Sequence, residues 1–82
     1  MSNEFTTYVN DDATMLDEAR SLAARALVKM MHMEYAAAAV LYDEAAGRVP
    51  DNYPAVASNY RASAESARWY AADMAKAHDT WD

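Results

Sequence analysis

The chain has 82 residues, a net charge of −6 and no cysteine. This length allows one small domain, the lack of cysteine excludes disulfides and thiolate chemistry, and the lack of any Lys/Arg cluster argues against direct binding to nucleic acid. One glycine and two prolines stand in a sequence rich in alanine and other good helix formers, so we expect helix almost throughout.

Residues 1–11 show no helical periodicity and are predicted to form a flexible N-terminal arm. Asn10, Asp11 and Asp12 are residue types that cap helix N-termini, so we expect a helix to begin near residue 12. Apolar residues then recur in alternating steps of three and four, the spacing of a coiled-coil seam. This first stripe consists of Leu16, Ala19, Ala23, Ala26, Met30, Met33, Ala37 and Val40. Because its phase does not slip between residues 28 and 36, we predict one continuous helix over residues 12–46.

The segment 47–54 is the clear break in the pattern. Gly47 suits a helix C-terminus, Pro50 blocks continuation, and Pro54 suits the first turn of a new helix. The second predicted helix runs from about residue 54 to residue 79 and has its own stripe: Val56, Tyr60, Ser63, Ala67, Tyr70, Met74, Ala77 and Trp81. Because the link is short, we predict an all-α fold, an antiparallel hairpin of two long helices over residues 12–82. The alternative is a three-helix bundle with a turn near residues 31–34.

The first predicted helix carries a second apolar stripe: Val28, Met31, Tyr35, Ala38, Tyr42 and Ala45. The two stripes together make a wide apolar arc, and a helix of that kind is normally buried on more than one side. The second helix can cover one side. We therefore predict that a second copy covers the other, giving a homodimer that completes a four-helix bundle.

Trp69 stands among polar helical neighbours, which include Glu65 and Asp73. A tryptophan on a polar face is a candidate interface anchor, since tryptophan is enriched at binding hot spots. Together with the larger members of the second stripe and the C-terminal tryptophan, it forms the predicted partner-binding set: Val28, Met31, Tyr35, Tyr42, Trp69 and Trp81.

The run Met30-Met31-His32-Met33 contains thioether and imidazole groups that soft Cu(I) accepts. On a continuous helix, however, consecutive side chains point in different directions, so we expect core methionines, a surface histidine and no metal site. The sequence also lacks a glycine-rich phosphate loop and a nucleophile placed beside a base. We therefore predict no catalytic residues, no cofactor and no enzyme activity.

Residues 19–50 resemble helical adaptor modules. Ala38, Tyr42, Ala45 and Pro50 stand at the spacing of the second helix of a tetratricopeptide repeat. The same region resembles a microtubule-interacting and transport (MIT) domain, a three-helix bundle that binds helical tail peptides; the similar residues are Ala19, Leu22, Ala26, Tyr35, Ala38, Leu41, Tyr42 and Ala45. Both families turn around residues 30–34, so the resemblance implies the three-helix alternative and the binding of a peptide or helix.

The chain is thus expected to be a non-enzymatic protein–protein interaction module that self-associates and binds a partner protein or helix through a Met/Tyr/Trp surface. One alternative is a small acidic viral or accessory inhibitor that occludes a functional surface of its partner; such a protein should gather Asp and Glu on one face. A second alternative is a structural subunit of a larger assembly. Because no basic or apolar N-terminal region and no long apolar run are visible, we expect a cytoplasmic protein without membrane contact.

Overall fold

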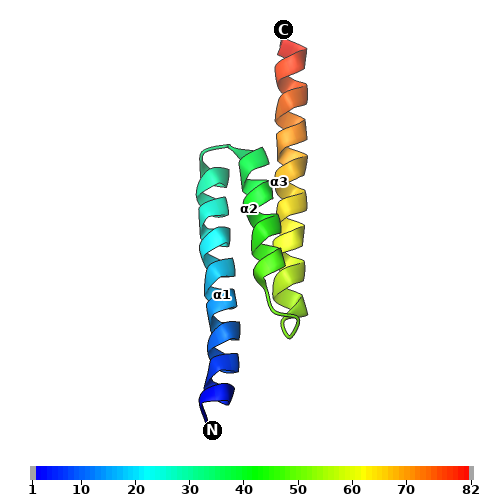
Figure 1. Ribbon diagram of the computed structural model, residues 1–82. Helices are drawn as coiled ribbons and strands as arrows, with labels where there is room; N and C mark the ends of the chain where they lie inside the picture. Colours follow the sequence, from blue (N-terminus) through cyan, green and yellow to red (C-terminus); the bar gives the residue numbers. More distant parts are fainter. Residues whose placement is uncertain (1, 82) are drawn as a thin grey trace.

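The computed structural model describes the backbone of residues 2–81 and the side chains of residues 12–76. Over this range the chain forms three helices: α1 (Ser2–Met31), α2 (Tyr35–Arg48) and α3 (Pro54–Trp81). Helix α2 packs against both long helices and is antiparallel to each (Figure 1). The fold is all-α, but it is the three-helix alternative, and the predicted hairpin of two long helices is wrong.

The turn between α1 and α2 is closed by backbone hydrogen bonds. The N–H of Glu34 donates to the carbonyl of Lys29 (2.8 Å), and the N–H of Met33 donates to the carbonyl of Met30 (3.0 Å). These two bonds make a Schellman motif, which ends a helix with one residue in the left-handed conformation, usually glycine. Here that residue is Met33, with φ of 62°. The predicted continuity between residues 28 and 36 is therefore wrong, and α1 ends at Met31.

The left-handed conformation costs a residue with a Cβ atom about 1–2 kcal/mol. Two features of the fold offset that cost for Met33. The Lys29 ammonium lies 3.6 Å from the Glu34 carboxylate and links the two sides of the turn. The turn also places α2 between α1 and α3, where its alanines become buried.

The loop between α2 and α3 follows the prediction more closely. Helix α2 ends at Arg48, and Val49 continues in an extended conformation, so Gly47 lies in the last helical turn without a positive φ. The N–H of Tyr53 donates to the carbonyl of Pro50 (3.0 Å), which closes a tight turn. Pro54 is the first residue of α3, where a missing N–H has no cost.

The two apolar stripes of the first predicted helix belong to two different helices. On α1 the first stripe faces inward: Ala19 and Ala26 are fully buried, whereas Val28 of the second stripe is exposed. On α2 the roles are exchanged, because Ala38 and Ala45 of the second stripe are fully buried. The wide apolar arc is therefore the mark of a helix break, and it does not by itself require a second copy to cover it.

The core is made almost entirely of alanine. The buried apolar residues are Ala19, Ala26, Ala38, Ala39, Ala45, Ala46, Val49, Ala57, Ala64 and Ala67. Among the described side chains, none of the large ones is fully buried. Such small side chains allow the helices to approach closely, but each of them removes little apolar surface from water.

The three helices overlap over only part of their lengths. The molecule is 66 Å long. At ~1.5 Å per residue α1 is about 45 Å long, α3 about 42 Å and α2 about 21 Å. Both long helices can fit within the length of the molecule only if they overlap by about the length of α2. Accordingly, the N-terminal part of α1 projects past the α2–α3 loop, and the C-terminal part of α3 projects past the α1–α2 turn (Figure 1).

Residues 2–11, for which the sequence predicts an arm, form the first turns of α1. The flexibility of this segment stays a prediction, and its side chains lie outside the described residues.

Candidate protein-binding surface

The large apolar side chains that remain exposed gather at one end of the fold. Those of the described residues are Leu27, Val28, Met31, Met33, Val40, Tyr53, Trp69, Tyr70 and Met74. All but Val40 and Tyr53 belong to the last turns of α1, to the turn that follows it, or to the part of α3 from residue 69 onward. The most exposed are Met31 (75%), Met33 (64%) and Trp69 (64%).

Three aromatic rings connect the start of α2 to α3. The rings of Tyr35 and Tyr70 have centroids 5.4 Å apart and are tilted by 31°. Tyr70 in turn meets Trp69 edge to face, with centroids 5.3 Å apart and an interplanar angle of 80°. Both separations lie in the range of favourable aromatic pairs. Tyr35 is only partly exposed, and its contact with Tyr70 connects the exposed rings to α2.

A shallow hollow of about 320 Å³ lies beside these rings. Its lining comes from the α1–α2 turn, the first turn of α2 and the second half of α3: Met33, Glu34, Tyr35, Ala36, Ala37, Ala71 and Met74. The hollow thus joins Met33 and Met74 into one surface with the aromatic rings. We call Met33, Tyr35, Trp69, Tyr70 and Met74 together the turn–α3 surface.

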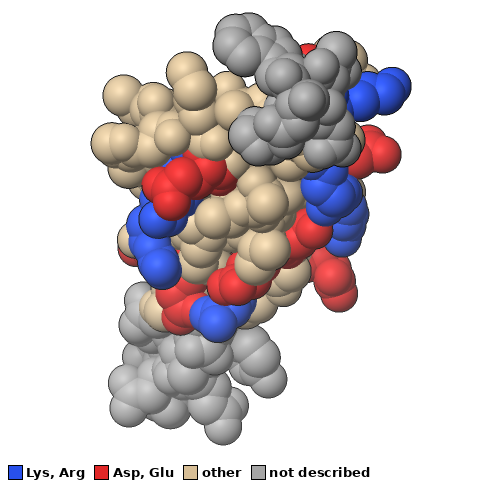
Figure 2. All heavy atoms as spheres, turned by 90° about the horizontal axis from the view of Figure 1, so that it is seen from above, with Lys and Arg blue, Asp and Glu red and all other residues tan. Residues whose placement is uncertain are grey.

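The end of the molecule that carries this surface has an uncharged centre. Seen from above, an area without Lys, Arg, Asp or Glu occupies the middle of the view, and charged side chains of both signs border it to the left, to the right and below (Figure 2). Charged residues are depleted at the core of protein–protein interfaces and more frequent at the rim, and the border of this area has that composition.

The predicted binding residues separate into groups in the structure. Tyr35 and Trp69 are part of the turn–α3 surface. Val28 and Met31 are exposed on the last turns of α1. Tyr42 is partly buried and lines a different hollow of about 390 Å³, between α1 and α3, together with Met30, Asn59, Ala62, Ser63 and Ser66. The side chain of Trp81 lies outside the described residues.

The sequence prediction missed Met33, Tyr70 and Met74. Met33 was assigned to the inner stripe of a continuous helix, and only the Schellman turn moves it outward. Tyr70 and Met74 were assigned to the seam between two long helices. They lie level with the N-terminal end of α2, where the Tyr35 ring contacts Tyr70, and both remain nearly half exposed. The sequence signal that could have indicated the helix break is the wide apolar arc made by the two stripes.

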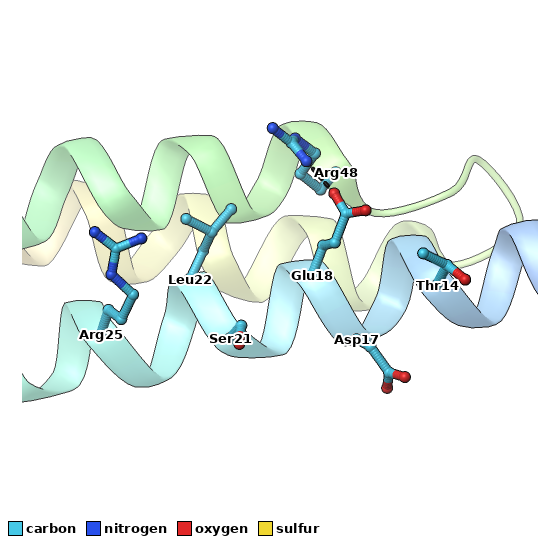
Figure 3. Close-up of a pocket in the computed structure, with 7 residues that line it drawn as sticks. All are labelled: Thr14, Asp17, Glu18, Ser21, Leu22, Arg25 and Arg48. Carbon is cyan, nitrogen blue, oxygen red and sulfur yellow. Dashed lines mark hydrogen bonds and ion pairs between the residues drawn. The ribbon is translucent and has the colours of Figure 1, made fainter.

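A third hollow lies between α1 and the C-terminal end of α2 (Figure 3). Thr14, Asp17, Glu18, Ser21, Leu22, Arg25 and Arg48 line it. In its upper part the Arg48 guanidinium and the Glu18 carboxylate meet as an ion pair, and Asp17 points away from α2 (Figure 3). Because two arginines and two carboxylates share this hollow, their charges balance and the site has no excess charge for an anion. The Arg48–Glu18 ion pair joins α2 to α1.

Within residues 12–76 no group of three or more His, Cys, Asp or Glu side chains could hold a metal ion. The Met/His run does not lie on a continuous helix as predicted, since Met31 ends α1 and His32 and Met33 are in the turn. The argument from diverging helical side chains therefore does not apply there, and the absence of a copper site stays a prediction. None of the described helical segments combines the length and the apolar character that a membrane crossing requires.

Comparison of the chain with models of protein families, with curated proteins and with solved structures found no match. The resemblance to MIT domains and tetratricopeptide repeats is thus not supported by any family match. What the structure establishes is a small all-α chain of three sequentially packed helices over its described residues.

Proposed function

We propose that this chain is a non-enzymatic protein–protein interaction module whose partner binds the turn–α3 surface. The observation that carries the proposal is an inversion of the usual distribution of side chains: the fold buries alanines and leaves Trp69, Tyr70 and several methionines exposed. Single exposed apolar residues are ordinary, but a contiguous group of them is typical of a binding site.

Met33 supports the same proposal. It occupies a left-handed position where glycine has a lower conformational cost, and its side chain is mostly exposed, so it adds little to the chain's own core. Met33 thus costs folding free energy and presents a flexible thioether at the edge of the aromatic group. Methionine adapts to irregular apolar partners, and a role in partner binding gives a reason for its presence.

The turn–α3 surface suits an apolar helix or the apolar face of another protein. Trp69 and Tyr70 are large anchors that hold their geometry through edge-to-face contact, and aromatic anchors contribute most of the binding energy at interfaces. The hollow beside them, lined in part by Ala36, Ala37 and Ala71, could accept a single apolar side chain of the partner.

The inhibitor alternative has less support. Asp17, Glu18, Glu34 and Asp43 each pair with an Arg or Lys side chain, and charges of both signs alternate around the face seen from above (Figure 2). A protein that imitates nucleic acid would keep its carboxylates unpaired on one face. A structural subunit would need exposed apolar areas on several faces. Among the described residues, all the large exposed apolar side chains except Val40 and Tyr53 lie at one end.

The resemblance to helical adaptor modules stays part of this proposal at the level of class. Both families turn around residues 30–34, and this chain turns at His32–Glu34; the small-residue positions of the first tetratricopeptide helix and a second repeat remain unmatched. Under this proposal the shared property is the binding of a helix or peptide, with no binding residue carried over.

The test is an affinity capture from the native host with quantitative mass spectrometry, using wild type, Trp69→Ser and the matched control Val40→Ser. Both substitutions replace an exposed apolar residue on a helix. We expect proteins captured by wild type to be lost with Trp69→Ser and retained with Val40→Ser. Captured proteins that bind all three variants equally would contradict the assignment of the turn–α3 surface.

A further inference from the structure

The hollow between α1 and α3 lies apart from the turn–α3 surface. Helices α1 and α3 run in the same direction on either side of α2 (Figure 1) and pack mainly against α2. Between them is the hollow of about 390 Å³, which we call the α1–α3 hollow. Its lining residues are uncharged, and those from α3 are small or polar: Met30, Tyr42, Asn59, Ala62, Ser63 and Ser66. An apolar side chain inserted there would bury no charged group of the lining.

Large apolar side chains lie on the α1 edge of this hollow. Leu27 is one helical turn before Met30, which lines the hollow, and Met31 is one turn after Leu27, so these residues share one side of α1. The opposite side of α1 carries Glu18, which pairs with Arg48 of α2. Leu27 is 55% exposed and Met31 is 75% exposed. We call Leu27 and Met31 the α1 ridge.

We infer that the α1 ridge of one copy of the chain packs into the α1–α3 hollow of a second copy, and that the second copy does the same in return. Each copy then contributes one ridge and one hollow, the reciprocal pattern that a twofold dimer requires. The inference goes beyond the proposed function, since neither ridge nor hollow shares a residue with the turn–α3 surface. Of the dimer predicted from the sequence it keeps Met31 and Tyr42, but not Ala38 and Ala45, which are buried within the chain.

Helices α1 and α3 keep one offset over the length that they share. Ala19 of α1 belongs to the same buried cluster as Ala57 of α3. Higher up, Met30 packs against a cluster that contains Ala67 of α3. The offsets given by the two pairs agree to within one residue, so each residue of α1 can be assigned a level on α3.

These levels favour a second copy as the occupant. By the same offset Leu27 is level with residues 64–65 of α3, between Ser63 and Ser66, and both serines line the hollow. A twofold axis parallel to the helices brings the second copy to the first without displacing it along them. Leu27 of the second copy therefore reaches the level of the hollow with no sliding of one chain along the other.

The second copy also covers more than a single foreign helix would. A helix of another protein inserted in the hollow would leave the outer side of the α1 ridge exposed, whereas the dimer covers ridge and hollow in both chains. The α1 ridge spans little more than one helical turn, so the interface falls below the ~1,200–2,000 Å² of a standard one. We therefore expect dissociation in the micromolar range. Each copy has a net charge of −6, so salt should strengthen the dimer by screening their repulsion.

Sedimentation equilibrium between about 1 and 200 µM tests the dimer. We expect a monomer–dimer equilibrium for wild type. Leu27→Glu should weaken dimerisation at least tenfold, because it places a carboxylate in the uncharged hollow at both contacts. The control Val40→Glu adds the same charge to an exposed position of α2 outside ridge and hollow, and should dimerise like wild type. A wild-type monomer at 200 µM, or equal dimerisation of Leu27→Glu and wild type, would overturn the inference.

A mixing experiment tests which surfaces meet. Ser66→Arg introduces a long cationic side chain into the hollow and should also weaken dimerisation by itself. An equimolar mixture of Leu27→Glu and Ser66→Arg should form heterodimers, because one contact gains an opposite-charge pair and the other is that of wild type. Circular dichroism should show equal helix content in both variants and wild type. A mixture that associates no better than either variant alone would overturn the inference.

Spin labels test the direction. The chain has no cysteine, so single Glu65→Cys and Ala72→Cys variants can each be labelled at an exposed position of α3. A twofold axis parallel to the helices keeps equivalent residues at one level, so the two variants should give similar label separations. In an antiparallel pair centred on the hollow, the separations would differ by about 20 Å, since the seven residues between the two positions count twice at ~1.5 Å each. A difference of that size would overturn the inference.

Discussion

The two halves of α3 share one helix and one stripe spacing but have opposite surroundings. In residues 54–68 the buried positions are Ala57, Ala64 and Ala67. From residue 69 onward the prominent side chains are Trp69, Tyr70 and Met74, and all three are exposed. The fully buried contacts of the first half are therefore made by alanines, whereas the large side chains of the second half remain about half exposed or more. This is the opposite of what a chain that stabilises only its own fold would gain from, because burying large side chains contributes more.

The two halves of α3 contribute differently to the fold and to the surface. The first half positions α2 through close contact between alanines, and the second half presents apolar surface beside the N-terminal end of α2 and the α1–α2 turn. A domain this small has a limited core, so the first half should control stability and the second half should control the binding of a partner.

The largest effect is expected from Ala67→Leu. Ala67 is fully buried against Ala38 and Ala39 of α2, and an added isobutyl group there would push the helices apart. Overpacking of this kind costs about 1–3 kcal/mol, and each kcal/mol shifts the Tm of a domain this size by about 4–8 °C. The measurement is thermal unfolding followed by circular dichroism.

The matched control is Ala72→Leu, the same substitution at an exposed position in the second half of α3. We expect it to change Tm by no more than 2–3 °C, in keeping with surface substitutions of less than about 0.5 kcal/mol. Equal losses for both variants would mean that the two halves of α3 are not distinct in their packing.

The sequence allowed part of this fold to be predicted. The loop after α2 was recognised because Pro50 and Pro54 restrict the backbone wherever they occur. The turn after α1 was missed because its left-handed residue is methionine, and nothing in the type of Met33 indicates a positive φ. The apolar phase also continues across that turn, so periodicity alone could not detect it; only the burial of Ala38 and the exposure of Val40 show that the inner face has changed.

The candidate surface was predictable to a similar extent. Trp69 was identified from its polar helical neighbours, and it is exposed. Tyr70 and Met74 carry the spacing of a covered seam, and they lie beside the start of α2 and the turn that was missed. One error about the backbone therefore led to two errors about the surface.

The second prediction concerns Met33. Its turn determines where α2 begins, and therefore which part of α3 the helix α2 can cover. Met33→Gly should raise the free energy of unfolding by about 0.5–1 kcal/mol, since removal of the ~1–2 kcal/mol left-handed strain outweighs the greater chain entropy of unfolded glycine. The same variant should bind partners more weakly, because it removes a thioether from the turn–α3 surface. Urea unfolding measures the first effect and capture the second.

Met31→Gly is the control for backbone effects. Met31 is exposed and ends α1 in a helical conformation, so glycine there should destabilise the fold by up to about 1 kcal/mol. Opposite signs for the two substitutions would support the strain at Met33. A loss of stability with Met33→Gly would show that the turn depends on the methionine side chain.

The smallest effect is expected from Asp43→Asn. The Arg68 guanidinium donates to the Asp43 carboxylate at 2.7 Å, and this ion pair joins α3 to α2 at the boundary between the two halves. Both side chains are about half exposed, and ion pairs in such surroundings contribute about 0–1 kcal/mol because water screens them. We expect a loss within that range. It should shrink further in 1 M salt, where the screening length falls to about 3 Å.

The neighbouring Glu44→Gln provides the matched control, since it removes the same charge from an exposed position of α2. Urea unfolding of both variants at low and high salt isolates the ion pair from the change in net charge. If Asp43→Asn were to cost more than Ala67→Leu, the first half of α3 would be held to α2 by charge and not by alanine packing. The contrast between the two halves would then be electrostatic, with the Arg68–Asp43 ion pair and not the contact of Ala67 with α2 as the main attachment.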